Sequence, residues 1–294
     1  MYIIYLYINK IVNCKYIINM EKSMKKNLEL IAVLMLCIII IILVLTYIYG
    51  KINIGITLIV FAITAGISFL IYLDKNITEE KVFLYIVPVI LIMFIFGIPI
   101  VKNADEIVHW HKVYDISQGN IITKKSNGVG VGWVPESVSI FIPQNEINYA
   151  KLAELYERKM DKNEKIVGVD LATDAIYHPL TYAPQVLGVL TAKIFTNRPI
   201  IMMYMARIFN SICSFVLLYL AIKIIPYGKR ILLLLTCIPV CANSLASMST
   251  DALTISVAYL LIAYVLKLIN EKQKKIELKE KIILRNFINC NCFM

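Results

Sequence analysis

The chain has 294 residues, of which 59% are hydrophobic and 17% charged, and its formal net charge is +10 at pH 7. A water-soluble core cannot bury so large an apolar excess, and the apolar residues come in blocks of roughly 20, the length at which a helix crosses a ~30 Å hydrocarbon layer. The composition therefore excludes an ordinary soluble protein and predicts one that spans a membrane several times.

The first part of the chain predicts a cytoplasmic N-terminal segment followed by three spans. Residues 1–27 form the cytoplasmic segment, and the first 20 of them are apolar but interrupted by Lys10, Asn13 and Lys15 and lack a small-residue cleavage site, so they do not resemble a signal peptide. We expect either that translation starts at Met20 or Met24, or that this stretch forms a short interfacial helix. Three transmembrane helices are predicted within residues 28–101, at 28–49, 52–73 and 82–101.

The second part predicts one long polar segment and three more spans. Residues 102–199 are of mixed polarity and are long enough to carry a site. Residues 200–269 contain predicted spans at 200–225, 231–247 and 252–269, and residues 270–294 form a basic cytoplasmic tail. The expected fold class is an all-α polytopic membrane protein with about six transmembrane helices and one large extracytoplasmic loop.

The distribution of charge sets the expected orientation. The predicted inner segments hold 17 Lys and Arg against 7 Asp and Glu, whereas residues 102–199 hold 11 of each. By the positive-inside rule the N-terminus is cytoplasmic, and the chain is expected to be a multi-pass protein of the bacterial plasma membrane in contact with the lipid bilayer. This topology explains the basic charge, so we expect no nucleic-acid partner.

Three features are predicted inside the polar segment. Residues 146–165 have the spacing of an amphipathic helix. Residues 180–195 are too short to span, and we expect a helix that lies at the outer interface or dips into the bundle. The glycines at 128, 130 and 132 do not match a phosphate-binding fingerprint and are expected to form a turn.

Two acids and a histidine follow the third predicted span. On a helix Asp105 and Glu106 lie four and three residues before His109, so the three side chains converge on one side. Two carboxylates and an imidazole are able to hold a divalent cation such as Mg²⁺ or Mn²⁺, or to take a proton from an attacking hydroxyl. The alternative is an ordinary solvated helix cap.

Four further residues complete the candidate site. His178 and Tyr182 lie in YHPLTYAP, which is either part of a pocket or an aromatic belt around a turn. Asp251 begins the sixth predicted span on the same side as Asp105, and helix capping is the alternative. Arg207 lies inside the fourth predicted span, where it must face protein or water, so it either meets a phosphate or forms a structural pair.

Taken in order, these elements resemble a family of predicted bacterial membrane proteins known as domain of unknown function 2142, which is related to the GT-C superfamily of glycosyltransferases. ADEIVHWHKVYDISQGNI is similar to the family's Pro-Asp-Glu-x-x-His element, although Ala104 replaces the proline. YHPLTYAP and SMSTDALT match in type and position, and the resemblance covers roughly residues 82–268.

The resemblance implies a GT-C-like enzyme that transfers a sugar from a polyprenyl-phosphate carrier during cell-envelope glycan assembly. The implied roles are general base or metal ligand for Asp105, support or metal binding for Glu106, support for His109, contact with the lipid phosphate for Arg207, and substrate binding for His178, Tyr182 and Asp251. The competing hypothesis is a non-enzymatic carrier or envelope-assembly partner. Since proteins of this type are usually longer, we expect a truncated copy, and the oligomeric state stays open.

Overall fold

The computed structural model describes residues 77–103, 105–126, 129–139, 149–161, 163–171 and 177–271, with a few isolated positions before residue 77. The chain divides into two compact units, residues 1–86 and 87–294, and the core and site described below belong to the second. The predicted spans at 28–49 and 52–73, the N-terminal segment and the tail after Glu271 fall outside the continuously described residues.

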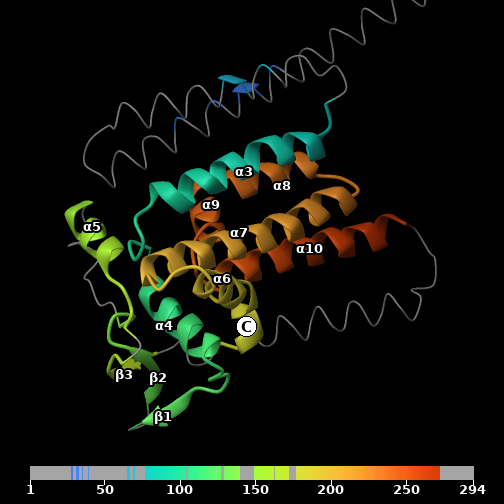
Figure 1. Cartoon of the computed structure of the whole chain (residues 1–294). Helices are drawn as coiled ribbons and strands as arrows, with labels where there is room; N and C mark the ends of the chain where they lie inside the picture. Colours follow the sequence, from blue (N-terminus) through green and yellow to red (C-terminus); the bar gives the residue numbers. More distant parts are fainter. Residues whose placement is uncertain are drawn as a thin grey trace, which may run out of the picture. The chain divides into compact units, whose positions relative to one another are not determined.

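Among the described residues, three helices are long and apolar enough to cross a membrane: α3 (Glu79–Gly97), α7 (Pro199–Ile224) and α10 (Asp251–Asn270). Their positions agree with the predicted spans at 82–101, 200–225 and 252–269. Long apolar runs form helices because a helix satisfies its own backbone polar groups where lipid offers no hydrogen bonds. Helices α7 and α10 lie side by side (Figure 1).

The predicted span over 231–247 is divided in two. Helix α8 (Lys229–Cys237) begins after Gly228, whose φ is 81°, and helix α9 (Pro239–Leu245) begins with a proline. Pro239 has no backbone N–H to donate, and its ring keeps Ile238 out of the helical region, at a ψ of 131°. The prediction of one continuous helix was therefore wrong.

Short helices occupy much of the polar segment 102–199. They are α4 (Glu106–Ser117), α5 (Tyr149–Glu157), the 3-10 helix η3 (Pro179–Tyr182) and α6 (Ala183–Lys193). Of the predicted helix over 146–165, residues 149–157 form α5, residues 158–161 and 163–165 are not helical, and residues 146–148 and 162 lie outside the described residues. The predicted helix over 180–195 is present as η3 and α6. Helix α6 packs directly on α7, since a Cβ on Gly188 would lie 2.4 Å from the carbonyl oxygen of Met205.

A three-stranded antiparallel sheet corrects the all-α fold class, although the chain is mostly helical. Strand β2 (Val129–Pro135) pairs on one side with β1 (Lys124–Ser126) and on the other with β3 (Ile166–Asp170). The predicted turn at Gly130 and Gly132 was wrong, since both lie inside β2. Valines alternate with these glycines at the period of a strand, and the bare Cα of Gly132 leaves room for the side chain of Leu171.

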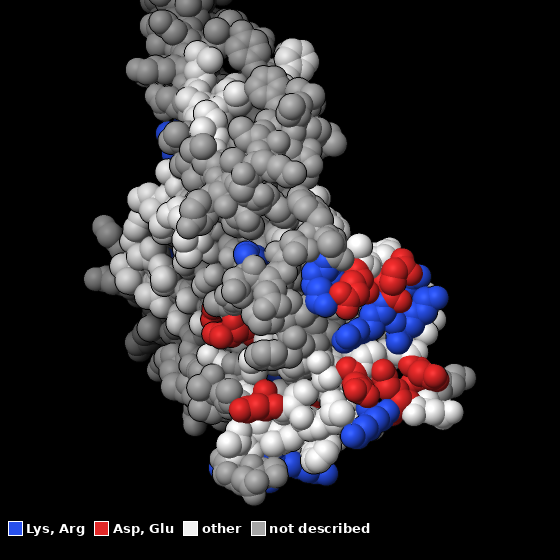
Figure 2. Space-filling view, turned by 90° about the vertical axis from the view of Figure 1, so that its left-hand side faces the viewer, with Lys and Arg blue, Asp and Glu red and all other residues white. Residues whose placement is uncertain are grey.

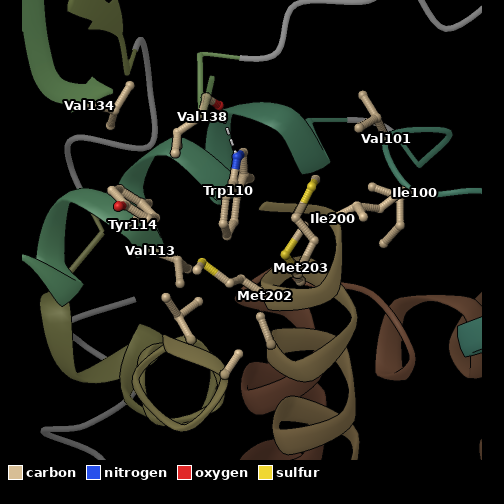
Figure 3. Close-up of a cluster of buried hydrophobic side chains, with 14 of the residues drawn as sticks. Ile100, Val101, Trp110, Val113, Tyr114, Val134, Val138, Ile200, Met202 and Met203 are labelled. Carbon is tan, nitrogen blue, oxygen red and sulfur yellow. Dashed lines mark hydrogen bonds between the residues drawn. The ribbon is translucent and has the colours of Figure 1, made fainter. Parts of the chain in front are cut away.

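A buried apolar core holds α4, α6 and the sheet against the beginning of α7 (Figure 3). Trp110 of α4 is completely buried, and its indole Nε1 donates to the carbonyl oxygen of Val138 at 3.1 Å. Met202 and Met203 of α7 lie on the opposite side of the ring from Val138 in Figure 3. The polar segment is therefore packed on a candidate span and is not a tethered soluble domain.

Exposed charges in this segment are balanced. Figure 2 shows acidic and basic side chains interleaved on one face of the molecule. Lys151 pairs with Glu154 at 2.7 Å, and Arg198 lies 3.8 Å from Glu157. Exposed pairs of this kind stabilise a protein by at most about 1 kcal/mol. These exposed pairs help to solvate the surface. The stability of the fold depends instead on the apolar core and on the buried ion pair described next.

Candidate functional site

A completely buried ion pair joins α4 to α7. Arg207 donates from Nε to Glu106 Oε1 at 2.7 Å and from Nη2 to Glu106 Oε2 at 2.5 Å, so the contact is bidentate. Neither side chain has exposed surface. A buried charge is tolerated only when it is paired and its other hydrogen bonds are satisfied. This pair is the electrostatic centre of the site.

The guanidinium of Arg207 also holds the end of α3. Its Nη1 donates to the carbonyl oxygens of Ile95 at 2.9 Å and Ile98 at 2.7 Å, and Nη2 donates to that of Pro99 at 3.2 Å. Carbonyl groups at the C-terminal end of a helix lack partners within the helix and carry partial negative charge, which a cation satisfies. Arg207 thereby fixes α3, α4 and α7 together.

Glu106 closes a strained turn in front of α4. Its Oε2 accepts from the backbone N–H of Val101 at 2.9 Å, and its Oε1 accepts from that of Met248 at 3.3 Å. Val101 and Asp105 have φ values of 71° and 57°, in the left-handed region that a β-branched residue such as valine rarely adopts. Such strain costs of order 1–3 kcal/mol and persists only where surrounding contacts enforce it.

Two buried side-chain amides form hydrogen bonds with the backbone between α9 and α10, next to the Glu106–Arg207 ion pair. Asn210 of α7 donates from Nδ2 to the carbonyl oxygens of Ser247 at 2.8 Å and Ser249 at 3.0 Å. Gln185 of α6 donates from Nε2 to those of Met248 and Ser249, both at 3.4 Å. The backbone of 247–249 is not helical, so these side chains replace the hydrogen bonds that a helix would supply.

Two more contacts complete what we call the Glu106–Arg207 network. Ser211 donates from Oγ to the carbonyl oxygen of Leu245 at 3.0 Å. Asn243 of α9 donates from Nδ2 to Oδ1 of Asn103, in the strained turn, at 2.8 Å. The network thus joins residues from α3, α4, α6, α7 and α9 to the chain that precedes α10.

Two carboxylates stay exposed at the edge of this network. Asp105 directly precedes Glu106, and its side chain forms no capping hydrogen bond with α4. Asp251 begins α10, three residues after Met248, and is also exposed. A carboxylate that is exposed but carried on a rigid buried support keeps its lone pairs available to a ligand or a proton.

The two predicted histidines occupy different environments. His109 Nδ1 lies 2.9 Å from the hydroxyl of Tyr182, both residues are buried, and the His109 ring centroid lies 6.1 Å from that of Tyr177. His178 precedes η3 and is exposed, and its Nδ1 accepts from the backbone N–H of Leu180 at 3.2 Å. His109 therefore packs inside the protein, whereas His178 keeps some accessible surface.

The predicted convergence of Asp105, Glu106 and His109 differs from the geometry. Glu106 faces Arg207, His109 faces Tyr182, and Asp105 is exposed. The bidentate contact of Arg207 matches the structural pair that was the alternative to phosphate binding. Asp105 precedes the helix with a φ of 57°, so helical spacing does not place its side chain beside those of Glu106 and His109.

Sequence reasoning missed Gln185 and Asn243 as parts of the network. A signal was present for α7, because Arg207, Asn210 and Ser214 recur every three or four residues along an apolar span, and such a polar stripe faces protein. No comparable stripe exists in α6, where Gln185 follows Pro184 directly.

A divalent cation does not fit Glu106 in this arrangement. Both carboxylate oxygens accept from Arg207, whose charge already compensates them, and both accept from backbone N–H groups. Among the described residues, no group of three or more His, Cys, Asp and Glu side chains is placed to hold a metal ion. The predicted Mg²⁺ or Mn²⁺ site therefore concerns Asp105 alone and stays a prediction.

The apolar helices and the charged pair buried among them define a membrane protein with several candidate spans. The sequence profile described as "Predicted membrane protein (DUF2142)" matches residues 89–286, so the chain belongs to this family. The match contains every residue of the Glu106–Arg207 network and confirms the resemblance to domain of unknown function 2142. No curated protein and no solved structure matches the chain significantly.

Proposed function

We propose that the protein is a GT-C-like glycosyltransferase that moves a sugar from a polyprenyl-phosphate donor to a hydroxyl acceptor during cell-envelope glycan assembly, with Asp105 as general base. The observation that carries this proposal is the exposed carboxylate of Asp105, fixed on left-handed backbone directly before the buried Glu106. A general base must be accessible to the hydroxyl that it deprotonates, and a rigid support lowers the entropic cost of orienting it.

The reaction in this proposal is a displacement at the anomeric carbon. The Asp105 carboxylate takes the proton of the acceptor hydroxyl while its oxygen forms the new glycosidic bond. The bond between the anomeric carbon and the carrier phosphate breaks, and the phosphate leaves with the bonding electrons. Asp251 and His178, which are both exposed, are the candidates for contact with substrate.

Glu106 and Arg207 are positioning residues in this proposal. They have no exposed surface, so they act by holding Asp105 and the chain before α10 in place. Tyr182 is also completely buried and acts through its contact with His109. The proposed topology places residues 102–199 on the outer side of about six spans, with the N-terminus inside.

Asp105→Asn tests the proposal with little structural disturbance. Asparagine adopts the left-handed region at least as readily as aspartate, so the turn is retained while the base is lost. We expect the purified full-length variant to transfer sugar from a polyprenyl-phosphate donor at least about 100-fold more slowly than the wild type. The matched control is Asp161→Asn, an exposed acid on the same polar segment. Equal rates for Asp105→Asn and wild type would contradict the proposal.

One observation favours the non-enzymatic alternative. Carriers bind substrate where helices are interrupted near the middle of the membrane, and the chain has an interruption between α8 and α9 and a buried polar stripe on α7. A carrier predicts that Asn210→Leu abolishes solute flux in proteoliposomes while Asp105→Asn leaves it unchanged. Sugar transfer by purified protein distinguishes the enzyme from the carrier.

A further inference from the structure

The C-terminal ends of α4 and α6 are fastened to each other. Lys193, the last residue of α6, donates from Nζ to Ser117 Oγ at 2.8 Å, and the same Nζ lies 4.2 Å from the ring centroid of Tyr114. After α4 the chain turns at Gly119, whose φ is 94°, and continues to β1. The short segments that follow α4 and α6 therefore begin close to each other.

These segments carry some of the most exposed apolar side chains among the described residues. The exposed fractions are 58% for Ile121, 83% for Ile122, 84% for Ile194 and 63% for Phe195, and we call these four residues the α4–α6 tip. Burial of large apolar side chains is favourable, so the joint exposure of these four to water is costly. Clustered exposure of this kind marks a surface that contacts another apolar phase.

The apolar face continues along α6 toward a candidate span. Leu187 and Leu190 are 56% and 43% exposed and, with Ile194, recur at helical spacing. Gly188 lies on the opposite side of the helix, against the backbone of α7, and Figure 1 shows α6 beside α7. The helix that carries this exposed face is therefore packed directly on a candidate span.

The exposed charges carried by the two tip segments are positive, whereas the nearby carboxylate of Asp115, which accepts from Asn120 Nδ2 at 2.8 Å, is buried. Lys124 and Lys125 are exposed at the start of β1, and residues 116–126 and 186–197 contain no acid. Lysines near an anionic membrane surface are attracted to the lipid phosphates. An apolar cluster bordered by lysines is complementary to a bilayer surface that contains anionic lipid.

We propose that the α4–α6 tip inserts into the boundary between headgroups and acyl chains of an anionic bilayer, with Lys124 and Lys125 at the phosphates. The lipid is the favoured occupant because α6 already packs on a candidate span. The proposal is independent of the catalytic role of Asp105, since none of these side chains belongs to the Glu106–Arg207 network.

Photo-crosslinking to lipid tests the insertion. The full-length protein carries benzoylphenylalanine at Ile122 or Phe195, is reconstituted in nanodiscs of phosphatidylglycerol and phosphatidylcholine, and is analysed by mass spectrometry after illumination. Ile212 of α7, 56% exposed in a candidate span, is the positive control, and Tyr156 of α5, 46% exposed, is the negative control. We expect lipid adducts at both tip positions at several times the Tyr156 yield.

Two outcomes overturn the proposal. One is a yield at the tip equal to that at Tyr156 while Ile212 still gives adducts, and the other is a crosslink to a second copy of the chain in place of lipid. The charge contribution is tested by Lys124→Gln/Lys125→Gln in the protein labelled at Ile122. We expect the share of phosphatidylglycerol among the adducts to fall by at least twofold, and an unchanged share with unchanged elution in gel filtration contradicts the assigned lipid class.

Discussion

Glu106 and Arg207 can both be completely buried because each compensates the charge of the other. Arg207→Met removes the cation and leaves a carboxylate without exposed surface, which costs about 3–5 kcal/mol for a pair of this kind. We expect thermal unfolding in detergent to show a loss of that size. Glu106→Gln/Arg207→Met is expected to lose less than the two single variants together, because no buried charge is left alone.

The control for this prediction is an exposed pair on the same protein. Arg198 lies 3.8 Å from Glu157, whose side chain is 75% exposed, so Arg198→Met is expected to cost at most about 1 kcal/mol. If Arg207→Met and Arg198→Met destabilise the protein equally, the Glu106–Arg207 network does not hold the helices together.

His111 makes the stability depend on pH. Burial lowers the pKa of His111 from its usual 6.5 to about 4, and a hydrogen bond with the backbone of Val138 opposes this only in part. Between pH 6.5 and 4 the His111 imidazole is therefore protonated in the unfolded chain and neutral in the folded chain. The free energy of unfolding is therefore independent of His111 protonation above pH 6.5. It decreases as the pH falls from 6.5 to 4, by about 3 kcal/mol in total.

Chemical unfolding at several pH values between 4 and 7 measures this dependence. We expect His111→Leu to flatten the curve of unfolding free energy against pH in this window. An identical slope for wild type and His111→Leu would show that other groups cause the acid sensitivity.

At the residue scale, the sequence identified several members of the network but not how they pair. Glu106 and Arg207 were singled out by residue type and position, yet they are 101 residues apart, and local spacing carries no information about such a contact. His109 and Tyr182 pair in the same way across 73 residues. Only the packing of α6 and α7 against α4 brings these side chains together.

At the element scale, the close packing of α6 on α7 requires the absence of a side chain at Gly188. A Cβ at Gly188 would lie 2.4 Å from the carbonyl oxygen of Met205, a backbone atom that cannot move without shifting α7. We expect Gly188→Ala to lower the free energy of unfolding by at least about 2 kcal/mol, as overpacked cores do. Alanine is the better helix former by about 1 kcal/mol, so a loss can only come from the crossing.

Leu187→Ala is the matched control for this prediction. Leu187 neighbours Gly188 but is 56% exposed, so in detergent its truncation is expected to change the stability by less than about 0.5 kcal/mol. Thermal unfolding of both variants measures the difference. A neutral Gly188→Ala would mean that α6 and α7 are farther apart than the structure shows.

Elements with one dominant physical cause were predicted well. The runs that form α3, α7 and α10 are apolar over the whole length of a span, and no other structure satisfies their backbone in lipid. The strand β2 was missed because Gly130 and Gly132 are poor strand formers. The presence of glycine in this strand is understood only from the residues that pair with it across the sheet and from the side chain of Leu171. The break before Pro239 was readable from the proline itself.

At the scale of the whole molecule, the network places two distant acids at one end of the candidate spans. Arg207 binds the last carbonyls of α3 from the first half of α7, and Glu106 binds Met248 just before α10 begins. Asp105 and Asp251 therefore lie at the same end of these helices. A shared site requires that this end, together with the polar segment, faces the outer aqueous compartment.

Labelling of single cysteines with a membrane-impermeant maleimide determines which side this is. In a variant whose seven native cysteines are replaced, we expect Asp161→Cys, exposed on the polar segment, to react in intact cells. Tyr227→Cys, 51% exposed between α7 and α8 at the opposite end, is expected to react only after permeabilisation, because Lys223, Lys229 and Arg230 favour the inner side. The reverse pattern would put Asp105 in the cytoplasm, where an acceptor outside the membrane cannot reach it, and the proposed transfer would lose its base.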